Sequence, residues 1–161
     1  MLNRRGYIVL EALLSIVVLS LVVLAVFPML SFLLKRSERS KYEAAASLLV
    51  QEGIEVAYNV FLDEDEWGLS NGDYHPSLNA SRGEWVLLVG GEQDIETRFD
   101  RVVNVASVCR TSGTGEVIDP ETYESCGGVV DYLSKWVTTR VSWEEGGETK
   151  SLEAKLMLLK V

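Results

Sequence analysis

RRGYIVLE, residues 4–11, leads without a break into an apolar run from Ala12 to Leu34. The 23 residues of this run carry no charge, and three serines are their only hydroxyl side chains. A helix of that length covers about 35 Å at 1.5 Å per residue, whereas the hydrocarbon core of a bilayer is about 30 Å thick. The sequence therefore predicts one membrane-spanning helix over residues 7–34.

One ionisable residue, Glu11, stands at the start of this helix. Placing such a side chain at the centre of a bilayer costs roughly 2.5–3.5 kcal/mol or more, so its presence has to be explained. A position near the interface, from which the carboxylate reaches the headgroups, is the simplest explanation. The residues before Glu11 suggest a functional one.

The order of basic leader, glycine, aromatic residue, three apolar residues and glutamate resembles the prepilin-peptidase site of type IV pilins and type II secretion pseudopilins. The resemblance implies that residues 1–6 are a leader, cut between Gly6 and Tyr7, and that the new amine of Tyr7 is methylated. It also implies that Glu11 pairs with that amine on a neighbouring subunit. Tyr7 departs mildly from the family, which usually has phenylalanine there, and an ordinary signal anchor is the alternative.

The apolar run is too long for the 7–15-residue core of a cleaved secretory signal, so we expect it to stay in the mature protein. Pro28 lies inside it and removes the helical hydrogen bond to the carbonyl of Leu24, which predicts a kink or a local opening. In lipid, neighbouring helices or side chains have to cover such an opening. Many type IV pilins have a proline at the same distance from their glutamate, which adds to the resemblance.

After Leu34 the composition becomes polar, but apolar residues still recur at three- and four-residue intervals. The spacing predicts an amphipathic continuation of the helix over residues 35–62, with Ala44, Ala45 and Ala46 allowing a sheet to pack closely. The segment QEGIE, residues 51–55, resembles minor type IV pilins of the pilus-modification (PilV) type. This resemblance favours a minor subunit over a major one.

Residues 63–161 are predicted to form a globular antiparallel β head of about four strands. The strands expected are 84–89, 95–108 with a bulge near residues 101–103, one around 137–143, and 152–158 after a hairpin turn at 144–148. Residues 67–72 and His75 are expected in loops. The predicted fold class is α+β and pilin-like, a long N-terminal α-helix packed on an antiparallel sheet. Two sets of alternating residues are expected to face the core: Val137, Thr139, Val141 and Trp143, and Leu152, Ala154, Leu156 and Leu158.

Two cysteines, Cys109 and Cys126, bracket a loop of 16 residues rich in Gly, Ser, Thr and Asp. A disulfide closing such a loop stabilises a fold by roughly 3 kcal/mol and is typical of an exported domain. Two separate buried thiols are the alternative. Redox chemistry is not expected, because a catalytic dithiol is usually spaced Cys-x-x-Cys. The sequence predicts the disulfide.

Composition and motifs argue against several other function classes. The formal charge of −9 would become −11 if Arg4 and Arg5 left with the leader, so no nucleic-acid partner is predicted. The chain has a single histidine and lacks phosphate-binding glycine loops, zinc-ligand spacing and a nucleophile elbow. The acidic run 63–66 lacks the alternating ligands of a calcium loop. We therefore expect no enzyme activity, cofactor or metal.

The resemblance implies a structural subunit, of the minor kind, in a type IV pilus. Its partners would be other pilin subunits, the prepilin peptidase, the inner-membrane pilus assembly platform and the membrane itself. The chain would first lie in the bacterial inner membrane with its N-terminus in the cytoplasm, and later in an extracellular pilus. A type II secretion pseudopilin and a single-pass, membrane-anchored extracellular binding module are the alternatives.

Overall fold

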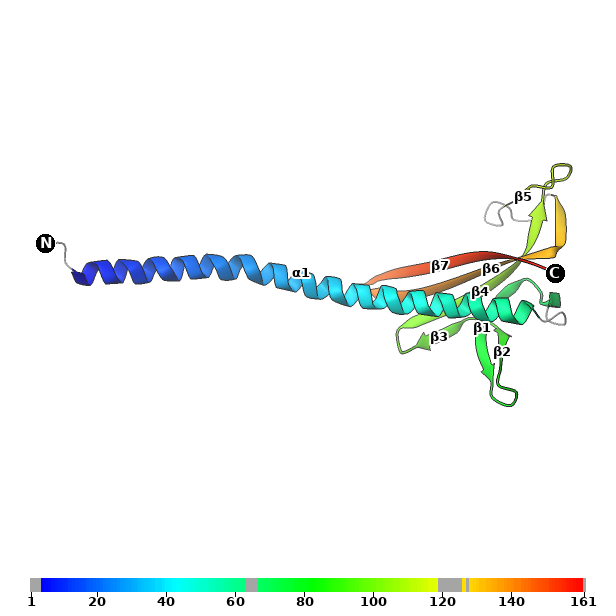
Figure 1. Ribbon diagram of the computed structural model, residues 1–161, viewed down its shortest axis with the longest axis horizontal. Coiled ribbons are helices and arrows are strands. Elements are labelled where there is room, and N and C mark those ends of the chain that lie inside the picture. Colours follow the sequence, from blue (N-terminus) through cyan, green and yellow to red (C-terminus); the bar gives the residue numbers. More distant parts are fainter. Residues whose placement is uncertain (1–3, 63–66, 119–125, 127, 161) are drawn as a thin grey trace. The chain divides into compact units, whose positions relative to one another are not determined.

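The computed structural model of the chain describes residues 4–62, 67–118, 126 and 128–160, with residues 4–6 described by their backbone alone. Within these ranges one helix precedes seven strands (Figure 1). The fold class is therefore α+β, with a long N-terminal helix and an antiparallel sheet, as predicted. The elements are α1 (Arg4–Phe61), β1 (Gly72–Asn79), β2 (Glu84–Val89), β3 (Glu92–Ile95), β4 (Phe99–Arg110), β5 (Val117–Ile118), β6 (Val129–Glu145) and β7 (Glu148–Leu159).

The chain forms two compact units. The first, Met1–Tyr42, contains the N-terminal part of α1, and the second, Glu43–Val161, contains the rest of α1 and all the strands. In the second unit the main strand order is β2-β1-β4-β6-β7, and β3 and β5 each pair with β4. Every pair is antiparallel, but the prediction of about four strands was wrong, because the sheet has seven.

The strand β1 was missed because its sequence, GDYHPSLN, has few β-forming residues and contains Pro76. Only Gly72–Tyr74 pair with β4, so Pro76 lies where β1 has a single neighbour, β2, and one missing N–H is tolerated. The expectation of a loop at His75 was also wrong, since this residue lies in β1 with its Nδ1 3.0 Å from the carbonyl oxygen of Gly90.

The predicted strand 95–108 is divided in two in the structure. Only its first residue, Ile95, belongs to β3, and the chain turns at residues 96–98 before it enters β4. Asp94, Glu96 and Thr97 have φ angles of 57°, 50° and 61°, a left-handed conformation that usually requires glycine. No glycine marks this turn, so it could not be predicted from local residue preferences.

The bulge predicted near residues 101–103 is absent from the pairing of β4 with β6, but the pairing of β3 with β4 shifts its register beside Arg101, between Glu92 opposite Arg101 and Ile95 opposite Phe99. The pairing of β4 with β6 runs regularly from Phe99 opposite Trp143 to Ser107 opposite Lys135, and shifts only between Ser107 and Val108. The alternation of apolar residues is interrupted instead by Arg101, which takes an inward position and is only 4% exposed.

The core lies between the part of α1 that belongs to the second unit, residues 43–61, and the inward faces of β4 and β6. The prediction for β6 is confirmed, since Val137, Thr139 and Val141 are fully buried and Trp143 is 5% exposed. The prediction for β7 is wrong in part, because Leu158 is buried but Leu152 and Leu156 are 37% and 36% exposed. The reason is that β7 is an edge strand that pairs with β6 alone. The predicted hairpin turn between β6 and β7 is present, with Gly146 and Gly147 at φ angles of 64° and 83°.

Candidate functional site

The N-terminal part of α1 exposes apolar side chains on all sides. Every large apolar side chain from Tyr7 to Leu34 is between 46% and 70% exposed. A helix that is apolar all round is suited to a membrane or to burial among other helices. By length and composition α1 can cross a membrane, which agrees with the predicted single-pass anchor.

The serines of this surface do not offer free hydroxyl groups to a partner. Ser15, Ser20 and Ser31 donate hydrogen bonds of 2.8, 2.7 and 3.1 Å to the carbonyl oxygens four residues earlier. Glu11 lies exposed on the same helix and is the only ionisable side chain between Ile8 and Leu34. The apolar surface therefore carries one charged group near its start.

The structure brings three of the predicted site residues together. Gly6, Tyr7 and Glu11 lie within about two turns of α1, which begins three residues before Tyr7. Pro28 lies further along the helix, and α1 continues through it. The peptide bond between Gly6 and Tyr7, where the resemblance implies cleavage, is part of the helix.

In the second compact unit, the QEGIE segment packs on the sheet. Glu52 forms an ion pair of 3.0 Å with the buried Arg101, whose guanidinium also lies 2.6 Å from Glu92 of β3. The Arg101 guanidinium therefore joins α1 to two strands of the head. A Cβ built on Gly53 would lie 2.5 Å from Cγ2 of Thr139, so a side chain at this helix position would require Thr139 to shift.

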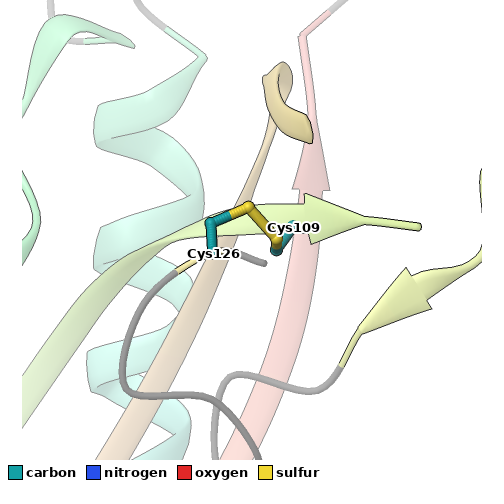
Figure 2. The surroundings of a disulfide bond; sticks show 2 residues. All are labelled: Cys109 and Cys126. Carbon is teal, nitrogen blue, oxygen red and sulfur yellow. A yellow bond between two sulfur atoms is a disulfide. The ribbon is translucent and has the colours of Figure 1, made fainter. Parts of the chain in front are cut away.

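The predicted disulfide between Cys109 and Cys126 is present (Figure 2). Cys109 is fully buried near the end of β4, and the two Cα atoms are 5.7 Å apart. The bond closes the chain segment that contains β5, and β5 pairs with the same end of β4. The covalent link therefore holds the segment at the end of β4.

Beside the disulfide, β6 contains an irregularity that sequence reasoning missed. Ser107 and Val108 of β4 pair with Lys135 and Asp131 of β6, so residues 132–134 have no partner in β4. The Asp131 carboxylate accepts hydrogen bonds from the Leu133 N–H (2.9 Å), the Ser134 hydroxyl (2.7 Å) and the Arg110 guanidinium (2.7 Å). The Ser134 hydroxyl and then Arg110 hold the pKa of Asp131 below its usual value. These bonds fix an irregular segment in which the side chain of Tyr132 is 81% exposed.

Among the residues that the structure describes, no three His, Cys, Asp or Glu side chains form a group that could hold a metal ion. The acidic run 63–66 lies outside the described residues. Two features therefore stand out: the apolar part of α1 from Tyr7 to Leu34, which carries the single carboxylate of Glu11, and the head with its disulfide. No protein-family model, curated protein or solved structure matches this chain.

Proposed function

We propose that the chain is a minor subunit of a type IV pilus, processed after Gly6 and assembled through its N-terminal helix. The observation that carries the proposal is the all-round apolar surface of α1 with one carboxylate, Glu11, close to the site that resembles a prepilin-peptidase site. The sequence supplies the resemblance, and the helix supplies a surface that other helices can cover.

A lone membrane anchor leaves Glu11 without a role. Its carboxylate would lower the stability of the inserted helix unless it reached the interface or found a cation. The amine of a neighbour's Tyr7 is such a cation, and an ion pair in a medium of low dielectric constant is strong enough to select the axial position at which subunits dock. The filament therefore accounts for a residue that the anchor does not need.

The proposed location follows from the same reasoning. Before assembly the chain lies in the bacterial inner membrane with its N-terminus in the cytoplasm, where prepilin peptidase and the assembly platform act on it. After assembly the head lies at the cell surface. The disulfide supports an oxidising compartment for the head.

The test replaces Glu11 by alanine and compares it with Glu38→Ala, which removes a carboxylate from an exposed position outside the apolar run. Each variant is expressed in the native host beside wild type, and the subunit is measured in sheared filaments and in membranes. We expect the amount of Glu11→Ala subunit in the filament fraction to be at least about tenfold lower than that of wild type, which corresponds to 1.4 kcal/mol or more. Glu38→Ala should match wild type, and both variants should remain in the membrane.

Intact-mass measurement of the same fractions tests processing. The assembled protein should begin at a methylated Tyr7 in wild type and in Glu38→Ala. Equal recovery of Glu11→Ala and wild type in filaments would refute the assembly role of Glu11. Absence of wild type from every filament fraction would instead favour the membrane-anchored binding module, and retention of residues 1–6 in filaments would contradict the pilin assignment.

A further inference from the structure

A hollow of about 420 Å³ lies between the last turns of α1 and the tip of the β1–β2 hairpin. Both of its sides belong to the compact unit Glu43–Val161. Its volume is within the range of roughly 300–1,000 Å³ that is usual for small-molecule sites. Among the residues that line it, those with polar or aromatic side chains are Asn59, Asn79, Arg82, Glu84 and Trp85.

The hairpin tip that carries four of these residues is held in place by hydrogen bonds. Asn79 and Glu84 are paired across the strands, and the backbone N–H groups of Arg82 and Gly83 donate to the Asn79 carbonyl oxygen at 3.1 and 2.8 Å. The Asn79 side-chain oxygen accepts a third bond, of 3.1 Å, from the Ser81 N–H. The polar groups at the hollow therefore stand on an ordered turn, which reduces the entropy lost when a ligand binds.

Trp85 gives the hollow an aromatic side chain that the core does not use. It is 43% exposed, whereas Trp67 and Trp143 are 8% and 5% exposed. Its neighbour across the strands, Leu78, is 53% exposed, but Leu87, two residues further along the same face, is buried. Exposure on this face of the hairpin therefore increases from Leu87 to Trp85, which lines the hollow.

The polar side chains of the hollow are planar groups that can donate and accept hydrogen bonds together. Two amides and a guanidinium supply donors, and the carboxylate of Glu84 supplies acceptors. Within the described part of the chain, Arg82 and Glu84 form no ion pair. Their charges cancel, so the site favours neither an anion nor a cation.

From these features we propose that the hollow binds a neutral saccharide. A sugar ring has an apolar C–H face that can pack on the indole of Trp85, and hydroxyl groups around its edge that can bond the amides, Arg82 and Glu84. A purely apolar ligand would remove water from the two charged groups without replacing their hydrogen bonds, which is unfavourable. An anionic ligand would meet the carboxylate of Glu84.

The test uses the full chain in micelles of an uncharged polyoxyethylene detergent, because detergents with sugar headgroups would compete. The probes are neutral trisaccharides of glucose, mannose, galactose and N-acetylglucosamine, titrated to about 10 mM so that sites of millimolar affinity are detected. Binding is measured by calorimetry and by tryptophan emission. We expect at least one trisaccharide to bind and to shift the emission to shorter wavelength, because Trp85 loses contact with water.

Substitutions assign the binding to the hollow. Trp85→Ala and Arg82→Ala should each weaken it at least about tenfold, as truncation of a binding-site anchor does, whereas Trp85→Phe should keep most of it. The matched control is Leu48→Ala, which removes an apolar side chain that is 68% exposed on α1 and does not line the hollow, and which should bind as wild type does. Failure of all four trisaccharides to bind would overturn the proposal. Binding that is unchanged in both Trp85→Ala and Arg82→Ala would overturn it as well.

The saccharide proposal does not depend on filament assembly. It is measured on the isolated chain, so its failure leaves the experiment on Glu11 unaffected. Conversely, saccharide binding by a chain that never enters a filament would fit the anchored binding module. The two proposals can therefore fail separately.

Discussion

Gly53→Ala is the substitution for which the structure gives the sharpest expectation. A Cβ at this position would lie 2.5 Å from Cγ2, 2.9 Å from Oγ1 and 3.3 Å from Cβ of Thr139. The shortest of these distances is about 0.9 Å below the 3.4 Å at which ordinary contact begins. Thr139 is fully buried in β6, between β4 and β7, so it has little room to move.

Two effects of opposite sign determine the change in stability. Replacing a helical glycine by alanine stabilises a helix by about 1 kcal/mol. Overpacking a filled core costs roughly 1–3 kcal/mol, and the three close contacts place this site at the upper end. We therefore expect Gly53→Ala to lower the free energy of unfolding of the head by about 2 kcal/mol.

The measurement is urea denaturation of the full chain in uncharged micelles, followed by the fluorescence of the buried tryptophans. Ser47→Ala is the matched control, because Ser47 is exposed on the same helix and its replacement should stabilise by a few tenths of a kcal/mol. Thr139→Ala removes the two closest atoms, so Gly53→Ala should no longer destabilise in that background, a coupling of about 2 kcal/mol. If Gly53→Ala in the otherwise native chain stabilises the head as Ser47→Ala does, the close packing of α1 on β6 is refuted.

Two further predictions concern the end of the head beside the disulfide. Replacing both Cys109 and Cys126 by serine should lower the free energy of unfolding by about 3 kcal/mol, measured in the same denaturation assay, and an unchanged stability would contradict the role given to the bond. Asp131→Asn tests the hydrogen bonds of the irregular segment. Because the pKa of Asp131 is lowered in the folded head, its contribution is present above its ordinary pKa of 3.8 and is lost as the pH falls through the lower, folded-state value. Urea titrations between pH 7 and about pH 3 should therefore show a smaller acid-dependent loss in Asp131→Asn than in wild type, and equal losses would contradict the assignment.

Local pattern was sufficient for some parts of the fold. The length of the apolar run, the spacing of the stripe that follows it and the pair Gly146-Gly147 each specify a structure within a few residues. The helix, the β6–β7 hairpin and the inward face of β6 were predicted for this reason. Pairing of Cys109 with Cys126 was predictable too, because one loop separates the cysteines.

The parts that were missed depend on contacts between distant segments. Pro76 is compatible with a strand only because β4 pairs with residues 72–74 of β1, which leaves β2 as the one neighbour of Pro76. The left-handed turn at Glu96 and Thr97 is held by the pairing of β3 with β4, and no residue in it is a glycine. The hollow at Trp85 likewise needs the end of α1 and the hairpin tip to meet, which no single segment specifies.

The burial of Arg101 depends both on local sequence pattern and on contacts between distant segments. An arginine at an inward position of an apolar strand cannot stay buried without opposite charges, because an unpaired buried charge is strongly destabilising. The sequence contains such charges in the covering helix, and Glu52 lies next to Gly53, where an added Cβ would lie 2.5 Å from Cγ2 of Thr139. An interruption in strand alternation can therefore have two causes, an inserted residue or a buried ion pair. In this chain the second cause is present, because Arg101 forms ion pairs with Glu52 of the covering helix and with Glu92 of β3.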